Sequence, residues 1–384
     1  MIVGFDVSRA QVDERAGPEN YTLNLLENLL RIDQKNFYRL YYNPRASSLQ
    51  LPFKHRASSF ELRPISWPKL WTQAGLAFEC VKNPPDILFV PAHTIPIVRR
   101  PSLKTMVTIH DVGFQKFLEQ YQRRWWRLYG GRISNFAARA ATHVIAVSES
   151  TKKDLIEKLN VKPDRITVVY EGVDHSRFAP NLKSQSAGGG SNLKTDEVKR
   201  KYSIDGEYLL FVGTIQPRKN LVRLIEAFSA LGERHSALSL VIAGKEGWLA
   251  DEIYRAPRKF GVESRVKFLG YVPTDGVISL MNGALAFVFP SLYEGFGLVV
   301  LEAMACGCPT VTSNTSSLPE VVGEAGVLVD PYSVEDIIRG IKRVLEFSEV
   351  QYQNLVEKGL KQAQKFTWQK TAKETIEVLE HLRS

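Results

Sequence analysis

One stretch of the chain predicts a strand, a glycine turn and a helix in immediate succession. The apolar run at 285–289 is typical of a strand buried on both faces of a parallel sheet. The chain then turns through Gly295 and Gly297 and enters an apolar helix that ends near Gly307. Because backbone N–H groups and the positive end of a helix dipole then lie at the carboxyl end of a strand, the stretch predicts an anion site at the edge of an α/β sheet.

Two carboxylates frame this turn. Glu294 lies on the turn itself, and Glu302 follows in the helix. If the helix begins near Gly297 or Leu298, Glu302 lies about one turn inside it, where a carboxylate oxygen can accept a hydrogen bond from a sugar or ribose hydroxyl. The alternative is that Glu302 is a solvated helix residue and the glycines only shape a turn. These residues alone do not separate the two interpretations.

The segment 291–305 resembles the family-4 retaining glycosyltransferases of GT-B fold, whose signature is a Glu, seven residues and a second Glu. The resemblance continues through 311–322 and covers nearly the whole chain. It implies two Rossmann-like, doubly wound parallel-sheet domains that face a cleft, and transfer of a sugar from a nucleotide diphosphate donor to an acceptor hydroxyl with retention at the anomeric carbon. In the implied donor site, Glu302 holds ribose hydroxyls and Glu294 holds hydroxyls of the transferred sugar. The donor site also includes Gly295, Phe296, Gly297 and Leu298.

The alternation of elements supports two domains, as does a length of 384 residues. Predicted strands are 2–7, 39–42, 87–90, 104–109, 143–147 and 166–169 in the first half, and 208–212, 238–243, 266–268, 285–289, 309–312 and 326–329 in the second, with helices at 21–32, 125–141, 221–231 and 274–282 between them. We expect an acceptor-binding domain at 1–174 and a nucleotide-sugar-binding domain at 175–366, with a flexible polar segment at 181–195. The resemblance implies that a helix at 367–384 crosses back onto the first domain.

Charge and cysteine content limit the partners. The net charge of +9 favours anionic partners, which include nucleotide-sugars, lipid head groups and nucleic acid. Nucleic acid is disfavoured because the chain lacks a recognised binding module. Three cysteines do not make a disulfide framework, and Cys306-Gly-Cys308 without a second pair is a poor zinc signal.

Several motifs are absent from the sequence. It contains neither an Asp-x-Asp motif nor a Walker pattern, and Gly295-Phe-Gly297 lacks the third glycine of a dinucleotide fingerprint. We therefore expect a metal-free mechanism without a cofactor, and ATPase and NAD-dependent functions are disfavoured. No apolar run approaches the roughly 20 residues that span a bilayer, and the start is typical of a first strand, so we expect a cytoplasmic protein.

Two adjacent cations follow the predicted strand at 208–212. Arg218 can donate in a fork to phosphate oxygens, and Lys219 adds a mobile point charge. An adjacent Arg-Lys pair is usually solvated surface, but its place beyond a strand end and the family match favour contact with the donor diphosphate. Gly213 and Thr214 belong to the same implied donor site. Relatives often carry Arg at the position of Thr214, so the phosphate contact on that side differs in this chain.

In the first half, His110 and Asp111 follow the strand at 104–109. A lone histidine is usually structural. Here the strand-end position and the matching active-site histidine of the family favour contact with the transferred sugar or the acceptor, through the side chain or the backbone carbonyl. With Glu294, they are the candidate catalytic residues. Gly17 matches the glycine loop of the family and is expected to face the diphosphate.

Three further sites follow from residue type or from the resemblance. Either Ser148 or Ser150 is expected to cap the helix that begins there, with contact between Ser148 and a glycan as the alternative. The segment 171–174 resembles the interdomain hinge of the family. The segment 270–273 resembles the part that lines the nucleotide base, with Val272 as the contact.

Two aromatic and basic stretches, 67–71 and 123–127, allow either buried packing or contact with a membrane interface near a lipid-linked acceptor. The expected donor is GDP-mannose and the expected acceptor is a glycan or lipid-linked glycan of polysaccharide, O-antigen or glycolipid assembly. A UDP-glucose donor, a non-catalytic nucleotide-sugar-binding protein and an epimerase of the same fold are the alternatives.

Overall fold

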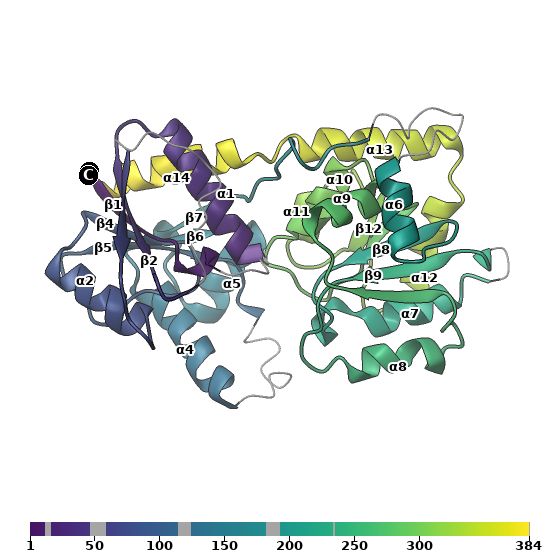
Figure 1. Cartoon of the computed structure of the whole chain (residues 1–384), viewed down its shortest axis with the longest axis horizontal. Coiled ribbons are helices and arrows are strands. Elements are labelled where there is room, and N and C mark those ends of the chain that lie inside the picture. The colour runs from purple at the N-terminus through teal and green to yellow at the C-terminus, as the bar shows by residue number, and fades with distance from the viewer. Residues whose placement is uncertain (12–16, 47–58, 114–123, 182–192, 233–234, 384) are drawn as a thin grey trace. The chain divides into compact units, whose positions relative to one another are not determined.

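The computed structural model describes the chain except for residues 12–16, 47–58, 114–123, 182–192, 233–234 and 384, and the side chains of 124–130, 193 and 194. The chain forms two compact units (Figure 1). Among the described residues, unit 1 comprises those within 1–172 and 367–383, and unit 2 comprises those within 173–366. The division after residue 172 lies close to the boundary predicted after residue 174.

Unit 1 is built on a sheet of seven parallel strands in the order β3-β2-β1-β4-β5-β6-β7. The strands are β1 (Ile2–Asp6), β2 (Phe37–Tyr42), β3 (Phe60–Pro64), β4 (Ile87–Val90), β5 (Lys104–Ile109), β6 (His143–Ala146) and β7 (Ile166–Val168). Strands β4 and β6 are buried along their whole length, which explains why β4 is a continuous apolar run and why β6 is apolar after His143. The strand order changes direction between β1 and β4, the switch point of a doubly wound sheet.

Helices cover both faces of this sheet (Figure 1). They are α1 (Gly17–Ile32), α2 (Ala77–Lys82), α4 (Arg124–Ala140), α5 (Glu149–Leu159) and α14 (Trp368–Arg383), and a π-helical turn at Thr72–Leu76 precedes α2. Side chains of α2, α4 and α5 share one hydrophobic cluster with β4, β5 and β6. On the other face, α1 packs against α14, and the Tyr21 hydroxyl of α1 lies 3.2 Å from the Thr108 hydroxyl of β5.

Unit 2 repeats the plan with six parallel strands in the order β10-β9-β8-β11-β12-β13. The strands are β8 (Tyr208–Val212), β9 (Ser239–Ala243), β10 (Val266–Gly270), β11 (Ala286–Phe289), β12 (Thr310–Ser313) and β13 (Val327–Val329). The helices are α6 (Leu193–Lys201), α7 (Leu221–Ser229), α8 (Asp251–Lys259), α9 (Thr274–Gly283), α10 (Leu298–Ala305), α11 (Leu318–Val322), α12 (Val334–Leu345) and α13 (Glu349–Ala363). The switch point of this sheet lies between β8 and β11. Two doubly wound parallel sheets confirm the predicted fold class.

The chain passes from one unit to the other at Gly172 and again at Phe366. A Cβ on Gly172 would lie 2.2 Å from the backbone nitrogen of Trp368, so only glycine fits there. Within unit 2, the Val173 N–H donates to the Phe366 carbonyl at 3.3 Å. Within unit 1, the Thr371 hydroxyl donates to the Tyr170 carbonyl at 2.8 Å. The two crossings therefore run side by side.

Two predictions of local structure were wrong. Strand β3 was missed because it is the exposed edge of the sheet, where Leu62 faces solvent and Pro64 ends the strand. Residues 193–195, predicted to belong to the flexible segment, begin α6, because Thr195 is buried against α9 and its hydroxyl donates to the Ser279 carbonyl at 3.3 Å. The rest of that segment, 182–192, lies outside the described residues.

Candidate functional site

The predicted glycine turn and helix are present in unit 2. Gly297 has φ +105° and precedes α10, and a Cβ there would lie 2.7 Å from Leu318 Cδ2. Backbone conformation and packing thus both require glycine. Because α10 begins at Leu298, Glu302 lies one turn inside the helix, as predicted, and its side chain is half-buried.

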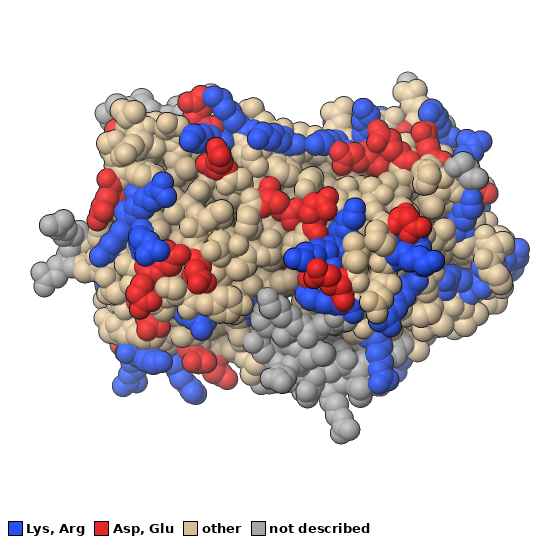
Figure 2. Space-filling view, turned by 180° about the vertical axis from the view of Figure 1, so that it is seen from behind, with Lys and Arg blue, Asp and Glu red and all other residues tan. Residues whose placement is uncertain are grey.

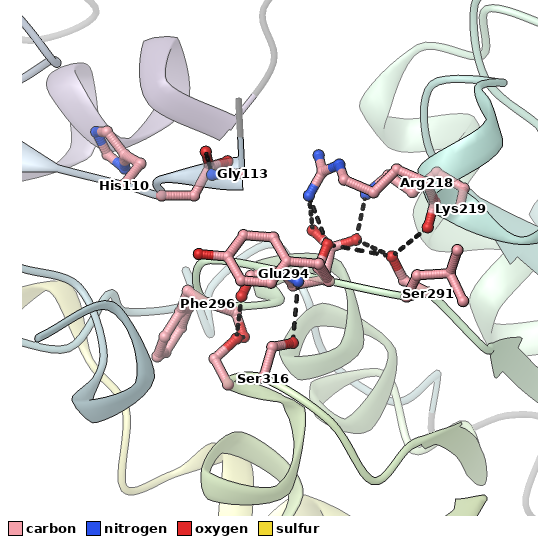
Figure 3. Close-up of polar contacts among 12 residues, drawn as sticks. His110, Gly113, Arg218, Lys219, Ser291, Glu294, Phe296 and Ser316 are labelled. Carbon is pink, nitrogen blue, oxygen red and sulfur yellow. Dashed lines mark hydrogen bonds and ion pairs between the residues drawn. The ribbon is translucent and has the colours of Figure 1, made fainter. Parts of the chain in front are cut away.

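Glu294 lies at the carboxyl end of β11, beside the two cations that follow β8. The Lys219 ammonium nitrogen is 2.6 Å from Glu294 Oε1, and Arg218 Nη1 is 3.3 Å from Glu294 Oε2 (Figure 3). All three side chains are largely buried, with 10–17% of each exposed. The structure therefore brings three of the predicted site residues together at the switch point of the sheet.

Glu294 is held in its charged form. Burial by itself would raise the pKa of this carboxyl, but the positive charges of Arg218 and Lys219 and hydrogen bonds from Lys219 and Ser291 outweigh burial, so the pKa is lowered. The Ser291 hydroxyl donates to Glu294 Oε1 at 2.5 Å. The carboxylate is therefore an acceptor over the physiological pH range.

A serine-rich loop after β12 supports the backbone of the turn. The Glu294 N–H donates to the Ser316 hydroxyl at 3.0 Å, and the Ser317 hydroxyl donates to the carbonyls of Glu294 at 3.0 Å and Phe296 at 2.7 Å (Figure 3). These serines, like Ser291, were not predicted as site residues. The signal for them is the run of hydroxyl residues directly after a strand at the same sheet edge.

The two cations are fixed by a single 3-10 turn, Pro217–Lys219. The Arg218 carbonyl accepts from the Leu292 N–H at 2.9 Å, and Arg218 Nη1 donates to the Tyr293 carbonyl at 2.6 Å. The Lys219 ammonium also lies 4.8 Å from the centroid of the Phe289 ring, a favourable cation–π distance. The cluster of Arg218, Lys219 and Glu294 carries two positive charges and one negative charge, and the excess positive charge suits an anionic ligand.

The other predicted donor residues of unit 2 follow the carboxyl ends of its strands. Thr214 is half-buried after β8 and packs beside Gly247, and a Cβ on Gly213 would lie 3.7 Å from Lys219 Cε. Phe296 is buried with its ring 5.8 Å from the Phe366 ring. Gly295 is also buried. Val272 follows β10 and is buried against Gly276.

In unit 1, His110 follows β5 as predicted. Its Nδ1 lies 3.1 Å from Glu171 Oε1, and its Nε2 lies 2.9 Å from the Pro91 carbonyl oxygen. Burial would lower the pKa of His110, but the hydrogen bond and charge of Glu171 and the bond to Pro91 raise it. The imidazolium form donates to both partners. Glu171, which lies in the predicted hinge, was not predicted to contact His110.

The remaining candidates of unit 1 lie near strand ends and helix starts. The Asp111 carboxylate accepts from the Gly113 N–H at 2.9 Å, in the turn after β5. Gly17 is the first residue of α1, and a Cβ on it would meet no described atom within 4 Å. Ser148 is confirmed as the cap of α5, because its hydroxyl accepts from the Thr151 N–H at 3.0 Å.

Of the two aromatic and basic stretches, only 67–71 has described side chains. Trp71 packs against the hydrophobic cluster of unit 1, and its Nε1 donates to the Ile65 carbonyl at 3.0 Å. Trp67 and Leu70 are 41% and 57% exposed. The stretch is therefore partly buried and partly surface, whereas residue 123 and the side chains of 124–127 lie outside the described residues.

Three further properties of the described residues are possible metal ligands, helices that could cross a membrane and the distribution of surface charge. Those residues contain no group of three His, Cys, Asp or Glu side chains placed to hold a metal ion. Among the described helices, none is long and apolar enough to cross a membrane. On the face drawn in Figure 2, Lys and Arg side chains are interspersed with Asp and Glu rather than gathered in one basic stripe.

Comparison with known proteins relates each half of the chain to a family. Residues 194–362 match the model of glycosyl transferases group 1, and residues 16–177 match that of glycosyltransferase family 4. The chain is 32% identical over 275 residues to the O-antigen chain mannosyltransferase B of Escherichia coli, covering 71% of this chain and 69% of that protein. It is 32% identical over 293 residues to the serotype-specific mannosyltransferase WbdA of the same species, of which it spans 34%.

Solved structures share the fold over nearly the full length. Sucrose-phosphate synthase from Thermosynechococcus elongatus has a TM-score of 0.74 at 18% identity, covering 99% of this chain and 98% of that one. Anabaena HepE, solved with UDP and glucose, has a TM-score of 0.72 at 17% identity, covering 99% and 100%. Two matching family models and a relative 32% identical over more than two thirds of both proteins show that the chain belongs to the group 1, or family 4, glycosyltransferases of GT-B fold.

Proposed function

We propose that this glycosyltransferase transfers mannose from GDP-mannose to a hydroxyl of a growing glycan, with retention at the anomeric carbon. The observation that carries the proposal is the buried cluster of Arg218, Lys219 and Glu294, two cations and one carboxylate at the switch point of unit 2. Mannose is favoured because the similar proteins of Escherichia coli are named mannosyltransferases. O-antigen or a related polysaccharide is the acceptor class for the same reason.

In the proposed reaction, the bond between the anomeric carbon and the diphosphate breaks, and the diphosphate leaves with the electron pair. The acceptor oxygen attacks from the same face, and its proton passes to an oxygen of the leaving phosphate. Arg218 and Lys219 stabilise the charge that develops on the diphosphate, the largest electrostatic requirement of this step. The proposed step uses no metal, and Glu294 orients the sugar by accepting from its hydroxyls.

Other residues of unit 2 are assigned to the nucleotide. Glu302, one turn inside α10, accepts from ribose hydroxyls, and Val272 contacts the base. The N–H groups of the turn from Gly295 to Leu298 lie at the start of α10, where they suit an anion. In this proposal, Gly17 of unit 1 faces the diphosphate, and Asp111 and the backbone carbonyl of His110 serve the sugar and the acceptor.

A ligand panel tests the donor. Thermal shift and calorimetry with GDP, UDP, ADP, GDP-mannose and UDP-glucose in EDTA are expected to show stabilisation by GDP and GDP-mannose, since a ligand stabilises the fold by the logarithm of its saturation. Stronger binding of UDP compounds would replace mannose with the UDP-glucose alternative. Binding that appears only with added metal would overturn the metal-free mechanism.

A transfer assay separates the remaining alternatives. Incubation of GDP-mannose with a mannose-terminated oligosaccharide is expected to give GDP and an extended glycan. Isomerised donor in the absence of acceptor would identify an epimerase. Tight donor binding without product would identify a non-catalytic nucleotide-sugar-binding protein.

We further propose that unit 1 contacts an anionic membrane that carries a lipid-linked acceptor. Six exposed apolar side chains, here named the apolar patch, lie on the segments around α2: Trp67, Leu70, Phe78, Val81, Ile97 and Val98. The segments contact one another, because Arg100 Nε donates to the Val81 carbonyl at 2.8 Å and the Ile97 N–H donates to Gln73 Oε1 at 2.9 Å. The same segments expose three basic side chains, Lys69, Lys82 and Arg100, which complement anionic head groups.

A further inference from the structure

The His110 ring has no nitrogen left for a ligand. Nδ1 is paired with Glu171 at 3.1 Å and Nε2 with the Pro91 carbonyl at 2.9 Å, and the residue is 7% exposed. The Tyr21 ring meets the edge of the imidazole at a centroid distance of 4.7 Å. A sugar hydroxyl that bound to this ring would have to displace a hydrogen bond already made in a buried place, which is unfavourable.

A second imidazole lies beside it. His93 follows β4, and its ring centroid is 5.4 Å from that of His110. Its backbone is fixed, since the His93 N–H donates to the Thr108 carbonyl at 3.1 Å. Its side chain is half-buried, and no described residue hydrogen-bonds to either ring nitrogen. Each ring nitrogen is therefore open to a ligand or to water.

The position of His93 is one at which doubly wound sheets bind ligands. In unit 1 the strand order changes direction between β1 and β4, and His93 lies just beyond the carboxyl end of β4. Arg9, which follows β1, interacts electrostatically with His93. Ligands of open α/β sheets bind beyond the strand ends at this switch point.

His93 is also in the protonation state that suits a hydroxyl. Burial lowers its pKa to about 4, and the charges of His110 and Arg9 contribute to this lowering against the opposing effect of Asp111. A neutral imidazole offers one donor and one acceptor, as does a hydroxyl group. The two rings thus differ: both nitrogens of His110 are paired and its pKa is raised, whereas the pKa of His93 is lowered and its ring is open to a partner.

We propose that His93 is a substrate-binding residue whose ring hydrogen-bonds a sugar hydroxyl, in the place that the family resemblance gives to the side chain of His110. The inference rests on the proposed function, because it takes the ligand of unit 1 to be a sugar. Two sources present the same chemistry, the acceptor glycan and the transferred sugar of the donor.

Steady-state kinetics of His93 variants, measured for the donor and for the acceptor, show whether His93 binds the acceptor glycan or the transferred sugar. His93→Ala is expected to raise KM at least tenfold for the acceptor if the acceptor is bound, or for GDP-mannose if the transferred sugar is bound. The Kd for GDP, which lacks the sugar, should not change in either case. His93→Gln, whose amide keeps a donor and an acceptor, should recover part of the loss. His381→Ala, which removes an exposed histidine of α14, is the matched control.

A binding measurement keeps the inference separate from the proposed function. The ring resonance of His93, assigned by its loss in His93→Ala, is followed by NMR in protein with 13C-labelled histidine. It should shift on addition of methyl α-mannoside or GDP-mannose, but not of GDP. A shift without transfer activity would leave the inference standing and remove the proposed function. Kinetics of His93→Ala equal to those of the His381→Ala control, or a His93 resonance that responds to neither sugar, would overturn the inference.

Discussion

The ammonium nitrogen of Lys219 lies 2.6 Å from Oε1 of Glu294, and each of these side chains is only 10% exposed. The proposed donor diphosphate therefore meets a cation that already has an anionic partner. Lys219 and Arg218 share that single carboxylate, so the cluster keeps one positive charge in excess. A buried pair of this kind is costly to break from one side only.

Lys219→Met should weaken GDP-mannose binding by about 10- to 150-fold, since a hydrogen bond to a charged group contributes about 1.5–3 kcal/mol. It should also lower the melting temperature, because Glu294 then loses one of its two cations. Calorimetry with GDP-mannose and thermal unfolding measure the two effects.

The double variant Lys219→Met/Glu294→Gln is the control for stability. Removal of both charges should restore much of the melting temperature but not the affinity for GDP-mannose. Wild-type affinity in Lys219→Met at an unchanged melting temperature would remove Lys219 from the donor site.

Glu294 should stabilise the folded protein near neutral pH and lose this contribution in acid. Its pKa in the folded protein is below the unfolded value of 4.5, so its contribution is present above about pH 4.5 and is lost as pH falls through the folded pKa. Urea unfolding of the wild type and Glu294→Gln from pH 3 to 7 should show a difference that is constant near neutrality and changes in favour of the variant in acid. A difference that is independent of pH would contradict the lowered pKa.

Gly172→Ala should destabilise the fold by about 1–3 kcal/mol, the usual cost of overpacking. The reason is that its Cβ would lie 2.2 Å from the Trp368 backbone nitrogen. Gly17→Ala is the matched control, since its Cβ meets no described atom within 4 Å and alanine favours a helix. Chemical denaturation measures both. Equal stability of the two variants would show that the crossing at Gly172 tolerates a side chain.

The apolar patch should bind anionic vesicles. Phe78 and Val98 are 61% and 67% exposed, and burial of such a side chain contributes about 1.5–3 kcal/mol, so Phe78→Ser/Val98→Ser should reduce binding to phosphatidylglycerol vesicles at least about tenfold. Val350→Ser, which changes a valine that is 78% exposed on α13, should leave binding unchanged. Vesicle co-sedimentation measures all three proteins. Equal binding of both variants would remove the patch as the membrane contact.

The sequence predicted the elements whose cause is local. The apolar run of β11, the turn that requires Gly297 and the start of α10 all follow from short patterns, so the place of Glu302 in the helix was predicted correctly. Pairing between distant residues has no such signal. Glu171 lies 61 residues from His110 in sequence, and only the fold brings them together. The same holds for Ser316, which supports the Glu294 backbone from another strand end.

The side-by-side crossings also have a consequence for the order of folding during synthesis. Unit 1 contains elements from both sides of unit 2, and α14 contributes buried residues that include Trp368, Ala372 and Leu379. The described residues of unit 2 all lie within 173–366, as an insertion in unit 1. Since the ribosome releases the chain from its N-terminus, all of unit 2 is available before α14 emerges. The unit that is translated first is thus the last to be completed.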